Sequence, residues 1–188
     1  MDNQTIDGTV TITSTALHDL SSFNLDFIGF EVSAVTINGE EARIQRSGKE
    51  MTIFLPIPAA EGDRFITQVS YAGTPGANID PLTTPEYSVG WYFYEDGVMV
   101  AGEPSGGSGW YPLNEHPSDE ALYTFRITVD EPYIAAANGT LQEVIENGNQ
   151  NTYVWRAEDP IANYLVTLGI GEFDVQTEIG PNGLPIRN

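Results

Sequence analysis

The chain has 188 residues, 40% of them hydrophobic, and it contains no cysteine. This length suits one domain with a core of its own, and the apolar content excludes an intrinsically disordered chain. The lack of cysteine excludes a disulfide framework and a thiolate metal site. A formal net charge of -20 disfavours binding to nucleic acid or to an anionic membrane. Such acidity fits either simple solubility or a salt-rich environment.

Alternation of apolar and polar residues predicts β-strands along the chain, whereas helical periodicity is weak. Two segments lack the strand pattern. Residues 117–121 indicate a turn of helix, and residues 73–85 indicate the one long loop. Asn-Gly pairs at 38–39, 138–139 and 147–148 follow three of the strands and signal tight turns. In chain order, strands are expected at 8–15, 31–37, 42–45, 51–55, 65–71, 122–129, 133–137, 140–146, 149–155, 163–170 and 172–177.

A dozen or so short strands separated by turns indicate an all-β fold, an antiparallel β-sandwich or a set of stacked sheets. Pro56 and Pro58 interrupt one strand and indicate a sheet edge or a bend. No run of about 18 apolar residues is present, so the sequence predicts no membrane span. Residues 1–4 lack the basic and apolar regions of a signal peptide.

The most informative segment is 90–129, which places aromatics, glycines and two acidic-proline clusters in an irregular stretch between strands. Loops on a rigid β scaffold are common locations for binding groups. The segment resembles the N-terminal domain of M1-family (membrane alanyl aminopeptidase-like) zinc metallopeptidases. The matching residues are Gly102, Glu103, Pro104, Trp110, Tyr111, Pro112, Asn114, Glu115, His116, Pro117, Tyr123, Thr124 and Phe125.

The resemblance extends over most of the chain and implies the saddle-like stacked sheets of that domain. Residues 1–188 would then be a single all-β domain and a fragment of a longer protein. The family has a strand before the segment 8–15, and this sequence lacks it. The last residues, 180–188, resemble the family's exit into the catalytic zinc domain, which would follow residue 188.

Zinc chemistry of this class needs His-Glu-x-x-His on a helix, where two imidazoles one turn apart bind the metal and the glutamate activates water. The sequence has only His18 and His116, and neither has this spacing. We expect both to be structural, and we assign no catalytic residue and no metal ligand. By the resemblance, zinc belongs to the parent enzyme, a peptide hydrolase, and this chain alone is expected to bind none and to be inactive.

By the same resemblance, Glu103 binds the free α-amino group of a peptide substrate, and Gly102 beside it contributes to the substrate site. The domain would cap the active site and pack on its own catalytic domain. The sequence departs from the family pattern at Ser108, where relatives often carry an arginine that could orient an acidic neighbour. Ala101 and Leu113 also differ, so the preferred substrate side chain stays open.

An alternative is a stand-alone β-sandwich module that binds carbohydrate or protein. The aromatic residues of the segment 90–111 motivate it, because such rings can line a sugar or peptide cleft. We expect packing in the core or at a domain interface to be their more frequent use, and we expect Trp155 in the core. Localisation stays open between a secreted or cell-surface parent and a cytoplasmic one.

Overall fold

The computed structural model describes residues 4–79 and 88–187 and confirms the all-β prediction, since these residues contain strands and three short 3-10 turns but no α-helix. The 3-10 turns are η1 (Gly107–Gly109), η2 (Asn163–Leu165) and η3 (Pro181–Gly183). The strands are β1 (Ile6–Thr15), β2 (Leu20–Asp26), β3 (Glu31–Ile37), β4 (Glu40–Glu41), β5 (Arg43–Ser47), β6 (Glu50–Ala59), β7 (Arg64–Gly73), β8 (Ala77–Ile79), β9 (Ser88–Tyr94), β10 (Gly97–Ala101), β11 (Glu120–Asp130), β12 (Ile134–Ala137), β13 (Thr140–Asn147), β14 (Gln150–Ala162), β15 (Leu168–Gly171), β16 (Thr177–Ile179) and β17 (Pro185–Arg187).

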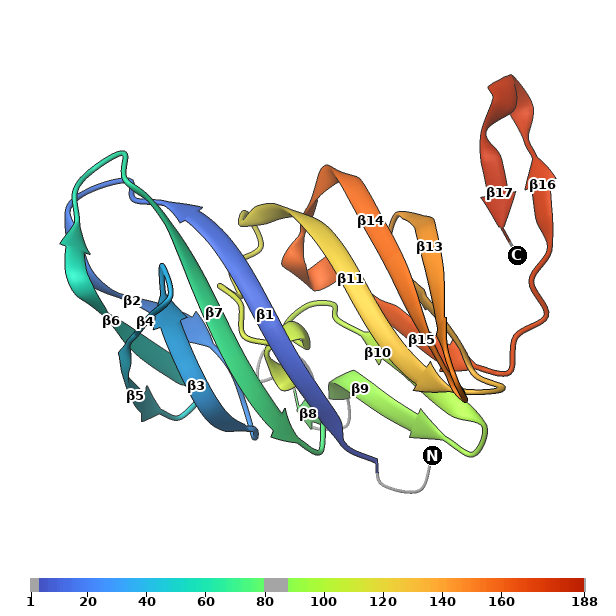
Figure 1. Ribbon diagram of the computed structural model, residues 1–188, viewed down its shortest axis with the longest axis horizontal. Helices are drawn as coiled ribbons and strands as arrows, with labels where there is room; N and C mark the ends of the chain where they lie inside the picture. Colours follow the sequence, from blue (N-terminus) through green and yellow to red (C-terminus); the bar gives the residue numbers. More distant parts are fainter. Residues whose placement is uncertain (1–3, 80–87, 188) are drawn as a thin grey trace.

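Four antiparallel sheets form the body of the molecule (Figure 1). The N-terminal half contains the sheets β1-β7-β3-β4 and β2-β6-β5. The other half contains β11-β14-β13 and β12-β15-β10-β9-β8. Strands β1 and β11 each have one neighbour in these sheets, so each lies at an edge. A hairpin of β16 and β17 projects from the body as an arm.

The Asn-Gly pairs adopt the turns that the sequence predicts, but the turn at 38–39 joins two paired strands and the turn at 138–139 joins strands of different sheets. Asn38 and Gly39 have φ values of 53° and 87° and join β3 to β4 in a hairpin. Gly139 also has a positive φ, yet β12 pairs with β15 and β13 pairs with β14. The turn at 138–139 therefore leads the chain from one sheet into another and closes no hairpin.

The two prolines of β6 lie where the ladder is interrupted, as predicted. Leu20 pairs with Ala59 and Ser22 pairs with Phe54, so the β6 residues between Phe54 and Ala59 bulge out of the register. Strand β5 pairs only with the earlier part of β6. A missing proline N–H costs no ladder bond at such a bulge.

Two hydrophobic clusters fill the space between the sheets. The first lies between the N-terminal pair of sheets and includes the fully buried Phe27, Met51 and Ile53. The second lies between the C-terminal pair and includes Trp155, which confirms its prediction as a core residue. Trp110 packs against both clusters and so connects them.

Four local predictions are wrong or only partly testable. Of the strand predicted at 163–170, residues 163–165 form η2, and the observed strand β15 begins at Leu168. Residues 172–176 form no strand, because the chain leaves the sheets after β15 and extends towards the arm. Residues 117–121 form a turn that runs directly into β11 instead of a turn of helix. The predicted loop at 73–85 contains strand β8, which pairs with β9, and its residues 80–85 lie outside the described part of the chain.

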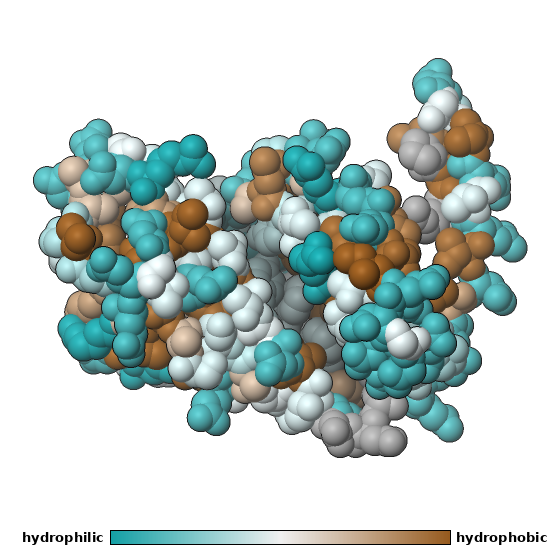
Figure 2. Space-filling model, in the orientation of Figure 1, coloured by the Kyte–Doolittle hydropathy of each residue, from teal (hydrophilic) through white to brown (hydrophobic). Residues whose placement is uncertain are grey.

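The arm exposes apolar side chains. Ile179 and Leu184 are 77% and 63% exposed, and Phe173 and Val175 on the connecting segment are about half exposed. Figure 2 shows brown, hydrophobic atoms along the projecting arm. In the described residues, no helix is long and apolar enough to cross a membrane.

Candidate functional site

Glu103 lies on the segment that follows β10 and contains η1. We call this segment, residues 102–111, the Glu103 loop. The Glu103 carboxylate is exposed and makes no hydrogen bond or ion pair with another described residue. Most of the loop backbone around it is buried, including Gly102 and the run from Gly106 to Gly109. The loop thus presents one carboxylate to solvent from a base that is packed into the protein.

Gly102 is buried because its backbone packs against the link between β14 and β15. A Cβ atom at this position would lie 2.8 Å from the carbonyl oxygen of Tyr164 and 3.1 Å from that of Val166. The N–H of Gly106 donates to the carbonyl oxygen of Gly102 at 2.7 Å and closes the loop on itself. Gly106 in turn packs against the backbone of Gly90 on β9. Two glycines therefore allow the loop to approach neighbouring backbone closely.

The far side of the loop is held by Glu115. The Glu115 carboxylate accepts a hydrogen bond from the backbone N–H of Ser108 at 3.0 Å and another from its hydroxyl at 2.7 Å. The Ser108 carbonyl oxygen accepts from the N–H of Ile28 at 2.8 Å, and the N–H of Glu115 donates to the Asp26 carboxylate at 3.1 Å. These bonds join η1 to the end of β2.

Lys49 supplies positive charge to this cluster. Its ammonium lies 3.5 Å from the Asp26 carboxylate and 3.7 Å from that of Glu115. The Glu115 side chain is only 4% exposed, that of Asp26 is 18% exposed, and Lys49 is about half exposed. Nothing in the sequence around Glu115 indicates this cluster, because Lys49 is distant along the chain. The only available signal was that Lys49 is the single lysine of the sequence.

Burial raises the pKa of Glu115, because removing a carboxylate from water disfavours its charged form. The hydrogen bonds from Ser108 and the nearby Lys49 ammonium act in the opposite direction, and the Asp26 carboxylate adds to the increase. Since burial is the largest effect, the carboxyl group holds its proton at higher pH than a solvated glutamate does.

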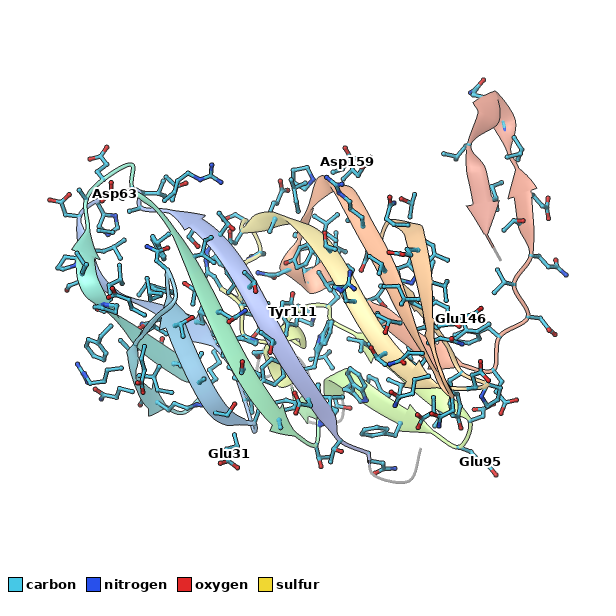
Figure 3. The ribbon with its side chains drawn as sticks, in the orientation of Figure 1. Glu31, Asp63, Glu95, Tyr111, Glu146 and Asp159 are labelled. Carbon is cyan, nitrogen blue, oxygen red and sulfur yellow. The ribbon has the colours of Figure 1, made fainter. Side chains whose placement is uncertain are left out.

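Aromatic residues of neighbouring strands contact the C-terminal end of the Glu103 loop, at Trp110 and Tyr111. The Tyr71 hydroxyl donates to the carbonyl oxygen of Trp110 at 2.9 Å. The Trp110 ring lies 4.5 Å from that of Tyr111 and 6.0 Å from that of Trp91, measured between centroids. Figure 3 shows Tyr111 in the middle of the molecule, between the two halves. Burial raises the pKa of both Tyr71 and Tyr111, so both phenols stay neutral.

The aromatic residues of the segment 90–111 pack largely in the core. Trp91 and Tyr111 are buried, and Tyr92, Phe93 and Trp110 are partly buried. Tyr94 is the exception at 58% exposed. Packing therefore accounts for most of these rings, and they form no exposed aromatic platform on the described surface.

The two histidines lie in different loops. His18 is exposed in the link between β1 and β2. His116 is exposed, and its Nδ1 accepts the N–H of Ser118 at 3.3 Å and lies 2.8 Å from the Ser118 hydroxyl. Buried Asn163 donates to the carbonyl oxygens of Asn114 and His116 and fixes the segment around this turn. His116 thus contacts loop backbone, in agreement with the structural role expected for it.

The residues present do not fit a zinc site. Within the described ranges, no group of three or more His, Cys, Asp or Glu side chains could hold a metal ion. The chemistry available at the Glu103 loop is that of a carboxylate facing solvent, which can accept hydrogen bonds from a cation or a neutral donor.

Comparison with known proteins identifies relatives of the chain. No protein-family model matches the sequence. A mutant of the M1 zinc metallopeptidase from Deinococcus radiodurans, bound to a Tyr-Ser-Ala substrate, has a similar structure, with a TM-score of 0.86 and 30% identity. The match covers 96% of this chain and 42% of that one. The solved relative is therefore more than twice as long as the region it shares with this chain.

Curated sequences agree over shorter stretches. Aminopeptidase A from Gloydius brevicauda is 28% identical over 86 residues, which are 45% of this chain and 9% of the relative. Aminopeptidase B from Rattus norvegicus is 23% identical over 137 residues, 71% of this chain and 20% of the relative. The chain spans a fifth or less of these curated relatives, and it is homologous to only a part of each.

Proposed function

Because the chain is homologous to part of the M1 aminopeptidases, we propose that it is the N-terminal domain of a zinc-dependent aminopeptidase in which Glu103 binds the substrate's free α-amino group. The domain caps the active site, and hydrolysis is carried out by a catalytic domain elsewhere in a longer protein. Zinc belongs to that catalytic domain, and the isolated chain is inactive.

One observation carries the proposal, namely an exposed carboxylate on a loop whose base is buried and bonded. An aminopeptidase must distinguish a terminal ammonium from an internal peptide group. A fixed carboxylate does so with a charge-assisted hydrogen bond worth about 1.5–3 kcal/mol. An internal peptide offers no cation, so binding it leaves the carboxylate desolvated and unpaired.

Gly102 contributes by geometry. Because Gly102 has no side chain, its backbone packs on the carbonyl oxygens of Tyr164 and Val166. This packing fixes the backbone position of the next residue, Glu103. A loop that is ordered before binding loses less conformational entropy when the substrate arrives. Gly102 is therefore part of the proposed substrate site through the position it gives to its neighbour.

The catalytic domain is the proposed partner of the apolar surface near β10 and β15. Met99 is 51% exposed and Phe173 is 45% exposed, and both line a shallow depression together with Tyr94. The solved relative contains additional chain, which could cover such a surface. The exposed apolar side chains of the arm are proposed to contact the same catalytic domain.

The test is a kinetic measurement on the longer zinc enzyme with an aminoacyl anilide. We expect Glu103→Ala to lower kcat/KM by about 10- to 100-fold, the range that corresponds to loss of one charge-assisted hydrogen bond. Glu95→Ala is the matched control, because Glu95 is an exposed acid at the turn between β9 and β10 (Figure 3). An unchanged kcat/KM in Glu103→Ala would refute the role of Glu103.

The alternative of a carbohydrate- or protein-binding module has less support, since its aromatic residues are largely packed inside. Tyr94 alone offers an exposed ring from that set. Calorimetric titration of the chain with oligosaccharides checks this alternative, and we expect no heat of binding.

A further inference from the structure

We propose that Lys49, Glu115 and Ser108 are positioning residues that hold the Glu103 loop in the conformation that presents its carboxylate to an ammonium group. The inference rests on the proposed function of Glu103, and it adds a support for that residue from η1 and from two segments outside the loop. None of the three residues is adjacent to Glu103 in sequence, and Lys49 comes from the turn between β5 and β6.

The first step is the bond pattern at Glu115. Its two carboxylate oxygens accept from one residue, with Oε1 on the Ser108 N–H and Oε2 on the Ser108 hydroxyl. A two-point bond fixes the orientation of η1 as well as its position. Gly107 lies close to the same carboxylate, since a Cβ atom there would be 3.5 Å from Oε1 and 2.8 Å from Leu113 Cδ1. Glu115 thus holds the loop within a few residues of Glu103.

The second step is the charge of the cluster. Asp26 and Glu115 are connected through the Glu115 N–H, and both carboxylates have restricted access to water. Two carboxylates in such a place repel each other unless a cation lies between them. Lys49 is within 4 Å of both, and it is the only lysine in a chain of net charge -20. A cation provided by a distant turn therefore opposes the effect of burial on Glu115 and favours its ionised form, which accepts both bonds from Ser108.

The third step connects the cluster to Glu103. The loop is fixed on one side at Gly102, by the backbone of the β14–β15 link, and on the other side at Ser108. Only a few residues separate these two points, and Glu103 is among them. Without the two bonds to Glu115, Ser108 keeps only its carbonyl bond from the Ile28 N–H, so this side of the loop is held less firmly. The Glu103 carboxylate then samples more positions and meets an ammonium less often.

Amide hydrogen exchange on the 188-residue chain tests the positioning. Lys49→Met removes the two ion pairs, and Glu115→Gln removes the charge from the group that accepts from Ser108. We expect each change to accelerate exchange at Ser108, Gly109 and Tyr111 by about tenfold or more. Arg156→Met is the matched control, because its ion pair with Glu158 at 3.8 Å is exposed on both sides. Lys49→Arg should retain slow exchange, since it keeps the charge.

Ser108→Ala provides a milder variant should the charge changes unfold the chain. It removes the 2.7 Å hydroxyl bond and leaves the backbone bond in place, so a smaller acceleration is expected. Exchange at 108–111 that is equal in the wild type and in all three variants would overturn the positioning proposal, whatever Glu103 does.

A second measurement separates this proposal from the function of Glu103. In the longer zinc enzyme, Lys49→Met should weaken inhibition by an amino acid amide about tenfold and leave the weak inhibition by its N-acetylated form unchanged. A general loss of structure would alter both. If Glu103→Ala changes neither inhibitor while Lys49→Met still accelerates exchange, the proposed function fails and the positioning of the loop stands.

Discussion

Glu115 shows how burial and pairing compete at a single carboxylate. Burial is the larger effect, so the folded-state pKa of Glu115 lies above its ordinary value of 4.5. The protonated form is then favoured by folding. By linkage, the contribution of Glu115 to stability is fully present below the unfolded pKa and is lost as the pH rises through the folded one. The charged groups that face it are Asp26 and Lys49.

The first prediction concerns this titration. Between about pH 4.5 and the raised pKa, the wild type should lose stability relative to Glu115→Gln, because the amide does not ionise. Urea denaturation of both proteins at several pH values measures the difference. If the wild type instead becomes more stable relative to the variant over this range, the effects of Lys49 and Ser108 on the pKa of Glu115 outweigh the effect of burial. Glu61→Gln is a suitable control, because Glu61 is an exposed acid in the turn between β6 and β7.

Gly102 gives a second prediction at the same scale. Gly102→Ala should destabilise the chain by about 1–3 kcal/mol, because the added methyl group would overlap two backbone carbonyl oxygens of the link between β14 and β15. Gly76→Ala is the matched control, since a Cβ atom there meets nothing within 4 Å. The denaturation midpoints of the two variants check this, and equal midpoints would contradict it.

At the scale of elements, one indole joins two sheets. Trp155 on β14 donates from Nε1 to the carbonyl oxygen of Ala135 on β12 at 2.9 Å, within the second hydrophobic cluster. Trp155→Phe should therefore cost about 1–3 kcal/mol through the unpaired carbonyl group, with a further cost from the space left behind. Thermal denaturation measures it. Tyr153→Phe, which loses a hydroxyl contact at the 3.5 Å limit, should cost far less.

The outer edge of β1 gives a prediction about association. The strand pairs with β7 on one side only, and unpaired edges can bind another strand. Copies of the chain should therefore associate through this edge, increasingly with protein concentration. Light scattering tests this, and a monodisperse monomer at all concentrations would count against it. Thr11→Lys adds charge at the edge and should weaken the association.

Sequence patterns predicted most strands and failed at connections. The alternation of β1 and β7 follows directly from one buried face, and the turn at 38–39 follows from positive φ values that Asn and Gly tolerate. Which sheet a strand joins depends on contacts between distant residues, so the sheet change at 138–139 has no local signal. The contact of Lys49 with Glu115 also has no local signal, because the two residues are far apart in the sequence.

At the scale of the whole molecule, charge opposes compactness. Acidic residues are spread across the view in Figure 3, where the labels mark Glu31, Asp63, Glu95, Glu146 and Asp159. With a net charge of -20, these groups repel one another over distances that salt screens, about 10 Å at 0.1 M ionic strength. We therefore expect the melting temperature to rise as sodium chloride is added.

Differential scanning calorimetry over a range of salt concentrations measures this effect. Potassium chloride should act in the same way as sodium chloride, because the cause is screening and not a specific ion site. A melting temperature that falls or stays constant with salt would mean that attractive pairs such as Lys49 with Asp26 dominate over the net repulsion.

The sequence by itself determined the all-β class, the turn positions, the core location of Trp155 and the identity of Glu103 as the residue to test. These depend on local periodicity, on backbone conformation and on a resemblance carried by a short segment. Only the tertiary structure decided which strands share a sheet, how Gly102 is packed and which cation accompanies Glu115. Each of those is a contact between segments that are far apart in the chain, and the free energy of such contacts exists only once the chain has folded.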